Sequence, residues 1–249
     1  MSLCKHCISG VRHEGVTEGK ETQINGVDVY IATPTVDYPK DKALLFLPDV
    51  FGHKLINAQL LADDFARNGF YTVVPDYLNG DALPPDAFND PNFKIMDWFP
   101  NHTQEKTRPT LDKVINGLKE QGIKEFAAIG YCFGGRYVFD LAFENLIKAA
   151  AVCHPSLLQV PDDLEKLLEK SNVPLLINSC TTDTQFPPES QAIADKLLGD
   201  GKYRPGYQRT YWDGCTHGFA VRGDLSDPKV KAGKEGAFKA SVEWFIQHM

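Results

Sequence analysis

Several features are scarce in this chain of 249 residues, and each absence argues against a class of protein. No run of 18 apolar residues occurs, and the opening stretch, MSLCKHCISGVRHEG, lacks the apolar core of a signal peptide. We therefore expect a cytoplasmic protein without a membrane partner. Basic residues are outnumbered, with 26 Lys and Arg against 33 Asp and Glu, and the net charge is −7. Such a chain lacks the excess of basic residues that is typical of proteins that bind nucleic acids.

Disulfide and metal motifs are also scarce. The six cysteines show no spacing of a disulfide scaffold, and a reducing compartment would keep their thiols free. Cys4 and Cys7, in CKHC, could form half of a zinc or redox site, but no second CxxC motif accompanies them. We expect a mobile terminal segment over residues 1–19, and the role of these two thiols stays open.

The chain does contain an alternation of short apolar runs and helical patterns. The runs are typical of strands buried on both faces, and they cover residues 43–47, 71–74, 126–129, 149–153 and 174–180. The helical pattern at 55–69 ends with Gly69, that at 108–122 begins near Pro109 and ends with Gly122, and that at 187–201 begins at Pro188. This alternation predicts one α/β domain over residues 1–249, with a mostly parallel sheet flanked by helices on both faces.

Three segments depart from the alternation. Asn25-Gly26 separates two strand-like runs, which predicts an antiparallel hairpin at a sheet edge. A final helix is expected from about Asp227-Pro228 onward. Residues 78–107 form a long stretch rich in Pro, Asn and Asp that also carries Trp98 and three Phe. We predict a lid over a pocket, with Trp98 as a candidate substrate contact; an insertion packed on the domain's own surface is the alternative.

A cysteine at a sharp turn is the main candidate for chemistry. The stretch EFAAIGYCFGGRYVFDLAF reads as strand, turn and helix, with Cys132 at the turn and Gly130 and Gly134 two residues to either side. A nucleophile at such a turn stands out at the carboxyl end of the sheet, where small neighbours allow a strained backbone. The positive end of the following helix favours thiolate over thiol.

The partners of this nucleophile follow from their order along the chain. In sites of this strand–turn–helix class, the nucleophile comes first along the chain, then a carboxylate, then a histidine. Asp183 directly follows the run 174–180, and His217 follows the strand candidate YQRTYW, so both lie at strand carboxyl ends. We predict a triad of Cys132, His217 and Asp183.

Other residues compete for these roles. His53 and His154 precede Asp183 and are expected to line the pocket, while Asp213 is interpreted as a turn-forming residue. The remaining histidines, expected at the surface, are His6, His13, His102 and His248.

Two backbone N–H groups would have to stabilise the oxyanion of the reaction. One is the N–H of the residue after the nucleophile, Phe133. The other is expected in the loop LPDVFGH, where Val50 is the candidate and Pro48 has no N–H to donate.

Taken together, these motifs resemble the dienelactone hydrolase (carboxymethylenebutenolidase) family of α/β hydrolases. The resemblance covers roughly residues 20–249 and rests on LPDVFG, VVPDYLNGD, GYCFGG, TTDTQFPP and THGFA. It implies an α/β-hydrolase fold and a Cys-His-Asp triad that opens a lactone through an acyl-enzyme. It also implies that the reaction needs neither a metal nor an organic cofactor.

The resemblance further implies two polar groups beside the triad. A carboxylate that meets the resting thiol and controls its ionisation corresponds to Asp49, where well-known members of the family have Glu. Those members bind a substrate carboxylate through two arginines. The stretch PDYLNGD contains no arginine, so Arg222, five residues after His217, is the remaining candidate, with a solvated loop charge as the alternative.

The leading interpretation is a hydrolase that opens a lactone or cleaves a related activated ester through Cys132. A thioesterase or acyltransferase with the same triad, and a thiol-based binding or redox module, are the alternatives. The expected partner is a small-molecule substrate. The oligomeric state is left open, a homodimer included.

Overall fold

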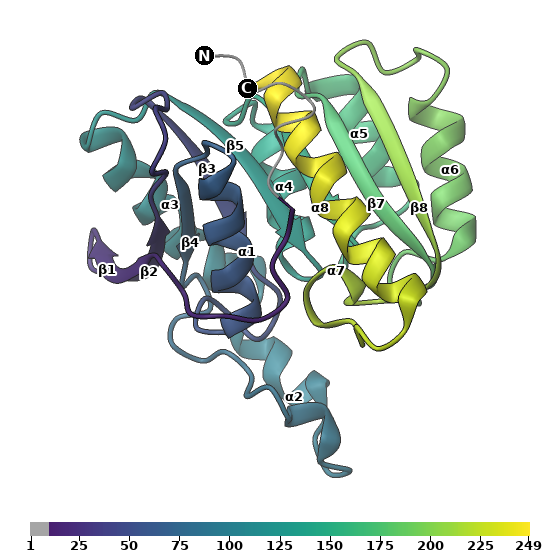
Figure 1. The fold of residues 1–249 in the computed structure, drawn as a ribbon. Coiled ribbons are helices and arrows are strands. Elements are labelled where there is room, and N and C mark those ends of the chain that lie inside the picture. The colour runs from purple at the N-terminus through teal and green to yellow at the C-terminus, as the bar shows by residue number, and fades with distance from the viewer. Residues whose placement is uncertain (1–9) are drawn as a thin grey trace.

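The computed structural model describes residues 10–249 and contains an eight-stranded sheet in the order β1-β2-β4-β3-β5-β6-β7-β8 (Figure 1). The strands are β1 (Lys20–Ile24), β2 (Val27–Ala32), β3 (Lys42–Leu47), β4 (Thr72–Pro75), β5 (Glu125–Tyr131), β6 (Ala150–Cys153), β7 (Leu175–Thr182) and β8 (Tyr207–Thr216). The pairs β1–β2 and β2–β4 are antiparallel, and all other neighbours are parallel. The predicted parallel sheet and its edge hairpin are confirmed.

Helices cover both faces of this sheet (Figure 1). They are α1 (Ile56–Arg67), α2 (Ile95–Trp98), α3 (Gln104–Glu120), α4 (Gly134–Phe143), α5 (Asp162–Lys170), α6 (Pro188–Leu198), α7 (Phe219–Arg222) and α8 (Pro228–His248). Alternate strand residues serve two separate cores. Leu44 and Phe46 pack with α1, α7 and α8 on one face, while Leu45 and Leu47 pack with α3 to α6 on the other.

Most of the predicted helix ends are confirmed, with one error. Gly69 and Gly122 follow α1 and α3 with φ of 89° and 98°, the left-handed conformation that suits glycine at a helix end. Helix α3, however, begins at Gln104, and Pro109 lies inside it instead of at its start. Pro109 and Glu105, whose carbonyl loses its intrahelical partner, are both exposed, so water can satisfy that carbonyl.

The stretch 78–107 is more structured than its composition suggested. It contains α2, two 3-10 turns (Ala87–Asn89 and Phe99–Asn101) and the start of α3, and Figure 1 shows it projecting from the body around α2. Trp98 is 8% exposed, donates through Nε1 to the Asp81 carbonyl at 2.8 Å, and stacks on His102 at 3.6 Å between ring centroids. His102 is thus buried, contrary to the expectation of a surface residue.

The N-terminal cysteines and the predicted absence of a membrane span are the next two points to compare with the structure. Cys4, His6 and Cys7 lie outside the described residues. Within residues 10–249, no helix combines the length and the hydropathy that crossing a bilayer would require.

The turn between β5 and α4 is built on close backbone contacts. A Cβ atom on Gly134 would lie 2.1 Å from the Leu47 carbonyl oxygen of the neighbouring strand, and one on Gly130 would lie 2.5 Å from the Gly134 oxygen. Both contacts are impossible for real Cβ atoms, so only glycine permits this approach. Cys132, between the two glycines, has a φ of 50°, in the left-handed region that non-glycine residues rarely adopt.

We therefore predict that Gly134→Ala lowers the free energy of unfolding by about 1–3 kcal/mol, because α4 must move away from β3. Urea unfolding curves measure the change. Gly10→Ala is the matched control, since a Cβ there meets nothing within 4 Å. An equal and small effect for both variants would contradict the close-contact account of this turn.

Candidate active site

Three predicted residues lie at the carboxyl ends of strands in one half of the sheet. Cys132 follows β5, Asp183 follows β7 and His217 follows β8. His217 Nδ1 lies 2.9 Å from Asp183 Oδ1, and the His217 backbone N–H donates to the Thr182 carbonyl at 2.9 Å. The parallel order of these strands thus brings together residues that are far apart in the sequence.

Asp183 is held in place by hydrogen bonds from its own loop as well as by the imidazole. It is 5% exposed, and its Oδ1 accepts backbone hydrogen bonds from Gln185 at 2.8 Å and from Phe186 at 3.1 Å. An ionised carboxylate only accepts hydrogen bonds, so the proton of this contact sits on His217 Nδ1. The other ring nitrogen, Nε2, is then the one that faces Cys132 and its surroundings.

Ser156 is the residue that the sequence reasoning missed. Its Oγ lies 3.3 Å from Cys132 Sγ and 3.5 Å from His217 Nε2, and its backbone N–H donates to the Cys132 carbonyl at 3.0 Å. Ser156 is 5% exposed and follows β6, the strand between β5 and β7. The sequence did place Ser156 near the carboxyl end of a predicted strand, because the tripeptide HPS directly follows the apolar run 149–153.

The charge state of His217 is set by competing effects. Burial lowers its pKa, but the hydrogen bond with Asp183 and the interaction with the Cys132 thiol outweigh this and raise the pKa to about 10. The imidazole is therefore held as a cation at neutral pH.

His154 touches His217 and shows the opposite behaviour. It is fully buried, its ring centroid lies 5.0 Å from that of His217, and neither ring nitrogen has a hydrogen-bond partner within residues 10–249. Burial, followed by the nearby charges of His217 and Arg222, holds its pKa well below the usual range. His154 is a neutral ring packed against a charged one.

Asp49, which is buried in the early loop, forms an ion pair with the half-buried Arg222 at the end of α7. Asp49 Oδ2 accepts from Arg222 Nε at 2.8 Å, and Asp49 Oδ1 accepts from the Phe51 N–H at 3.0 Å. The Arg222 guanidinium lies over the Phe51 ring at 4.5 Å. Arg222 is therefore a paired residue and not a solvated loop charge, while control of the thiol by Asp49 stays a prediction.

The two oxyanion candidates are the backbone N–H groups of Val50 and Phe133. Val50 lies within the loop that the Asp49–Arg222 pair holds, and its carbonyl accepts from Leu83 N–H at 2.8 Å. Phe133 directly follows Cys132. Among the described residues, neither N–H donates a hydrogen bond, so both remain available to a ligand.

The remaining rivals lie elsewhere. Asp213 is exposed and pairs with Lys229 Nζ at 2.7 Å, and His53 lies beside Asp76. Burial raises the pKa of Cys153 and of Cys180 to about 12, so these thiols stay protonated at neutral pH.

The raised pKa of His217 predicts a pH-dependent stability. The folded protein keeps a proton with a pKa of about 10, whereas the unfolded chain releases it near 6.5. The contribution of His217 taken by itself is complete below pH 6.5 and is lost as the pH rises toward 10. In urea unfolding series over this range, we expect a flatter dependence of unfolding free energy on pH for His217→Gln than for wild type. Parallel curves would contradict the assignment.

Comparison with known proteins identifies the family of the chain. The family model described as "Dienelactone hydrolase family" matches residues 27–249. Hydrolase pyvD from Aspergillus violaceofuscus is 36% identical, with 98% of this chain and 96% of the relative covered; Dienlactone hydrolase 1 from Gibberella moniliformis is 32% identical, with 97% and 92% covered. The crystal structure of a putative dienelactone hydrolase from Klebsiella pneumoniae superimposes with a TM-score of 0.71 at 18% identity, covering 94% of this chain and 100% of that one. The fold is therefore of the α/β-hydrolase type, and the chain belongs to the dienelactone hydrolase family.

Proposed function

We propose that this hydrolase cleaves lactones or activated esters with Cys132 as nucleophile, His217 as base and acid, and Asp183 as its orienting carboxylate. One observation carries the proposal: a continuous line of contacts runs from Cys132 Sγ through Ser156 Oγ to His217 Nε2, and from His217 Nδ1 to Asp183. Membership of the family supports the hydrolase class.

The first half of the reaction forms an acyl-enzyme. In this proposal the imidazole holds the proton of the thiol, which reaches it through Ser156, and the thiolate attacks the carbonyl carbon. The carbonyl oxygen becomes an oxyanion, which the N–H groups of Val50 and Phe133 stabilise. The C–O bond to the leaving alkoxide then breaks as His217 returns its proton to that oxygen. In a lactone the alcohol stays attached, so the ring opens without loss of a fragment.

The second half releases the product. A water molecule gives a proton to His217 Nε2 and attacks the thioester carbon, and the C–S bond breaks. The products are a carboxylic acid, which ionises, and the regenerated thiolate–imidazolium pair. Asp183, through its contact with Nδ1, keeps Nε2 directed at the reacting atoms.

Ser156 lies where the proton has to move. Its hydroxyl can accept from one partner and donate to the other, and it contacts both Cys132 Sγ and His217 Nε2. We therefore assign it the role of holding the thiolate and the imidazolium at a fixed separation and passing the proton between them.

Removal of the nucleophile is the direct test. Cys132→Ala should lower kcat/KM for an aryl ester by a factor on the order of 10³ or more, and Asp183→Asn by about 10³–10⁴, since the imidazole loses its orienting carboxylate. Asp213→Asn is the matched control, because Asp213 is exposed and pairs with Lys229.

The loss of activity in a variant supports the proposal only if that variant is folded. Urea unfolding curves establish that each variant is folded, and wild-type turnover in a folded Cys132→Ala variant would refute the proposal. An effect of Asp213→Asn as large as that of Asp183→Asn would refute the choice of carboxylate.

Ser156→Ala tests the proton path. Loss of a hydrogen bond to a charged group costs about 1.5–3 kcal/mol, so we expect kcat/KM to fall about 10- to 100-fold. Alkylation of Cys132 by iodoacetamide, followed by peptide mapping, should slow as well, which a purely structural role would not cause. Ser241→Ala is the control, since Ser241 is also buried and bonded, but to Asn178. Unchanged alkylation in Ser156→Ala would exclude the relay.

A further inference from the structure

Two carboxylates face each other at the end of the antiparallel pair β2–β4, in the half of the sheet that does not carry the triad. Strand β2 pairs with β4 so that Val29 lies opposite Pro75, and the Asp76 N–H donates to the Asp28 carbonyl at 2.9 Å. Asp28 and Asp76 are thus the next opposed residues, and directly opposed residues project from the same face. Like charges in this arrangement are destabilising unless a positive charge lies between them.

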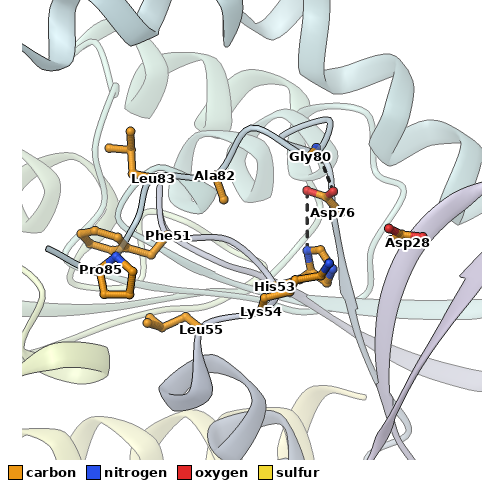
Figure 2. A pocket seen from close by; sticks show the side chains of 10 residues that line it. All are labelled: Asp28, Phe51, His53, Lys54, Leu55, Asp76, Gly80, Ala82, Leu83 and Pro85. Atoms are coloured by element: carbon orange, nitrogen blue, oxygen red, sulfur yellow. Dashed lines mark hydrogen bonds and ion pairs between the residues drawn. The ribbon is translucent and has the colours of Figure 1, made fainter. Parts of the chain in front are cut away.

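His53 lies beside this pair with an unused nitrogen. It is 4% exposed, its Nδ1 is 3.6 Å from Asp76 Oδ1, and its Nε2 has no hydrogen-bond partner among the described residues although it is shielded from solvent. Figure 2 shows the imidazole pointing toward Asp76, with Asp28 on the neighbouring strand beside them. One ligand atom from each of the three residues lies within 4.8 Å of the others.

Each carboxylate is held by a neighbouring donor. Asp76 Oδ2 accepts from the Gly80 N–H at 2.9 Å, and Asp28 Oδ1 accepts from Gln23 Nε2 at 2.7 Å. Asp76 Oδ1, by contrast, is buried without a hydrogen bond within residues 10–249. Such outer contacts orient the ligands of metal sites.

The three side chains also border an open space. A cavity of about 290 Å³ is lined by Asp28, His53 and Asp76 together with residues of the loops around 51–55 and 80–85 (Figure 2). Water can therefore reach the cluster and complete the coordination of an ion. Lys54 lines the same cavity, but its side chain is exposed and can extend into solvent.

We propose that Asp28, His53 and Asp76 form a binding site for a divalent transition-metal ion, with water in the remaining coordination positions. One imidazole and two carboxylates suit Zn²⁺ or Mn²⁺. The bound ion joins β2 and β4 to the loop that runs from Asp49 to His53, and so it fixes the loop that carries Val50. It takes no part in the ester chemistry.

The test uses Mn²⁺, because thiolates such as those of Cys4 and Cys7 favour Zn²⁺ and would obscure the count. Electron paramagnetic resonance of free Mn²⁺, titrated with the full-length protein, should show one ion bound per chain. Asp28→Asn and His53→Gln should each weaken binding at least about tenfold. A thermal unfolding series should show a rise in Tm with Mn²⁺ for wild type that both variants lack.

The choice of variants keeps the test decisive. Asp28 is exposed, so Asp28→Asn folds even if substitution of the buried Asp76 does not. Asp41→Asn is the control, because Asp41 is an exposed carboxylate at the opposite end of β3. The proposal is overturned if wild type binds no Mn²⁺ at millimolar concentration, if Asp28→Asn binds as wild type does, or if Asp41→Asn weakens binding equally.

Discussion

The close contact between α4 and β3 is the constraint on which the rest of the structure depends. Gly134 lies against the Leu47 carbonyl, and no side chain larger than hydrogen fits between them. The chain can enter α4 so near the sheet only through a left-handed residue, and that residue is Cys132. The strain of this conformation is balanced by the packing of β5 and α4, and it directs the sulfur toward the residues that follow β6, β7 and β8.

Two histidines in contact show how local partners decide charge. His154 and His217 are both largely buried, and burial alone lowers the pKa of each. Only His217 has a carboxylate, Asp183, whose own position is fixed by two backbone N–H groups. That contact, together with the interaction with Cys132, reverses the direction of the pKa shift and favours the positive charge, while the neutral His154 packs beside it.

Features encoded by local pattern could be predicted from the sequence, and features created by tertiary contacts could not. The apolar runs fixed the strands, and the order of Cys132, Asp183 and His217 was enough to foresee their convergence. Pro109 misled the prediction of α3, because its exposed position allows water to replace the missing hydrogen bond. The burial of His102 depends on the ring of Trp98, and the position of Ser156 depends on where β6 lies in the sheet, which no single segment reveals.

The position of β8 has a further consequence. This strand forms the outer edge of the sheet and leads directly into His217, whereas Cys132 and Asp183 follow strands with neighbours on both sides. Edge strands separate from a sheet at lower cost than central ones. Partial opening of this edge would move the imidazole away while Cys132 and Asp183 stay in place. Mild denaturation would then give a compact but inactive protein, which regains its activity when the edge strand pairs again.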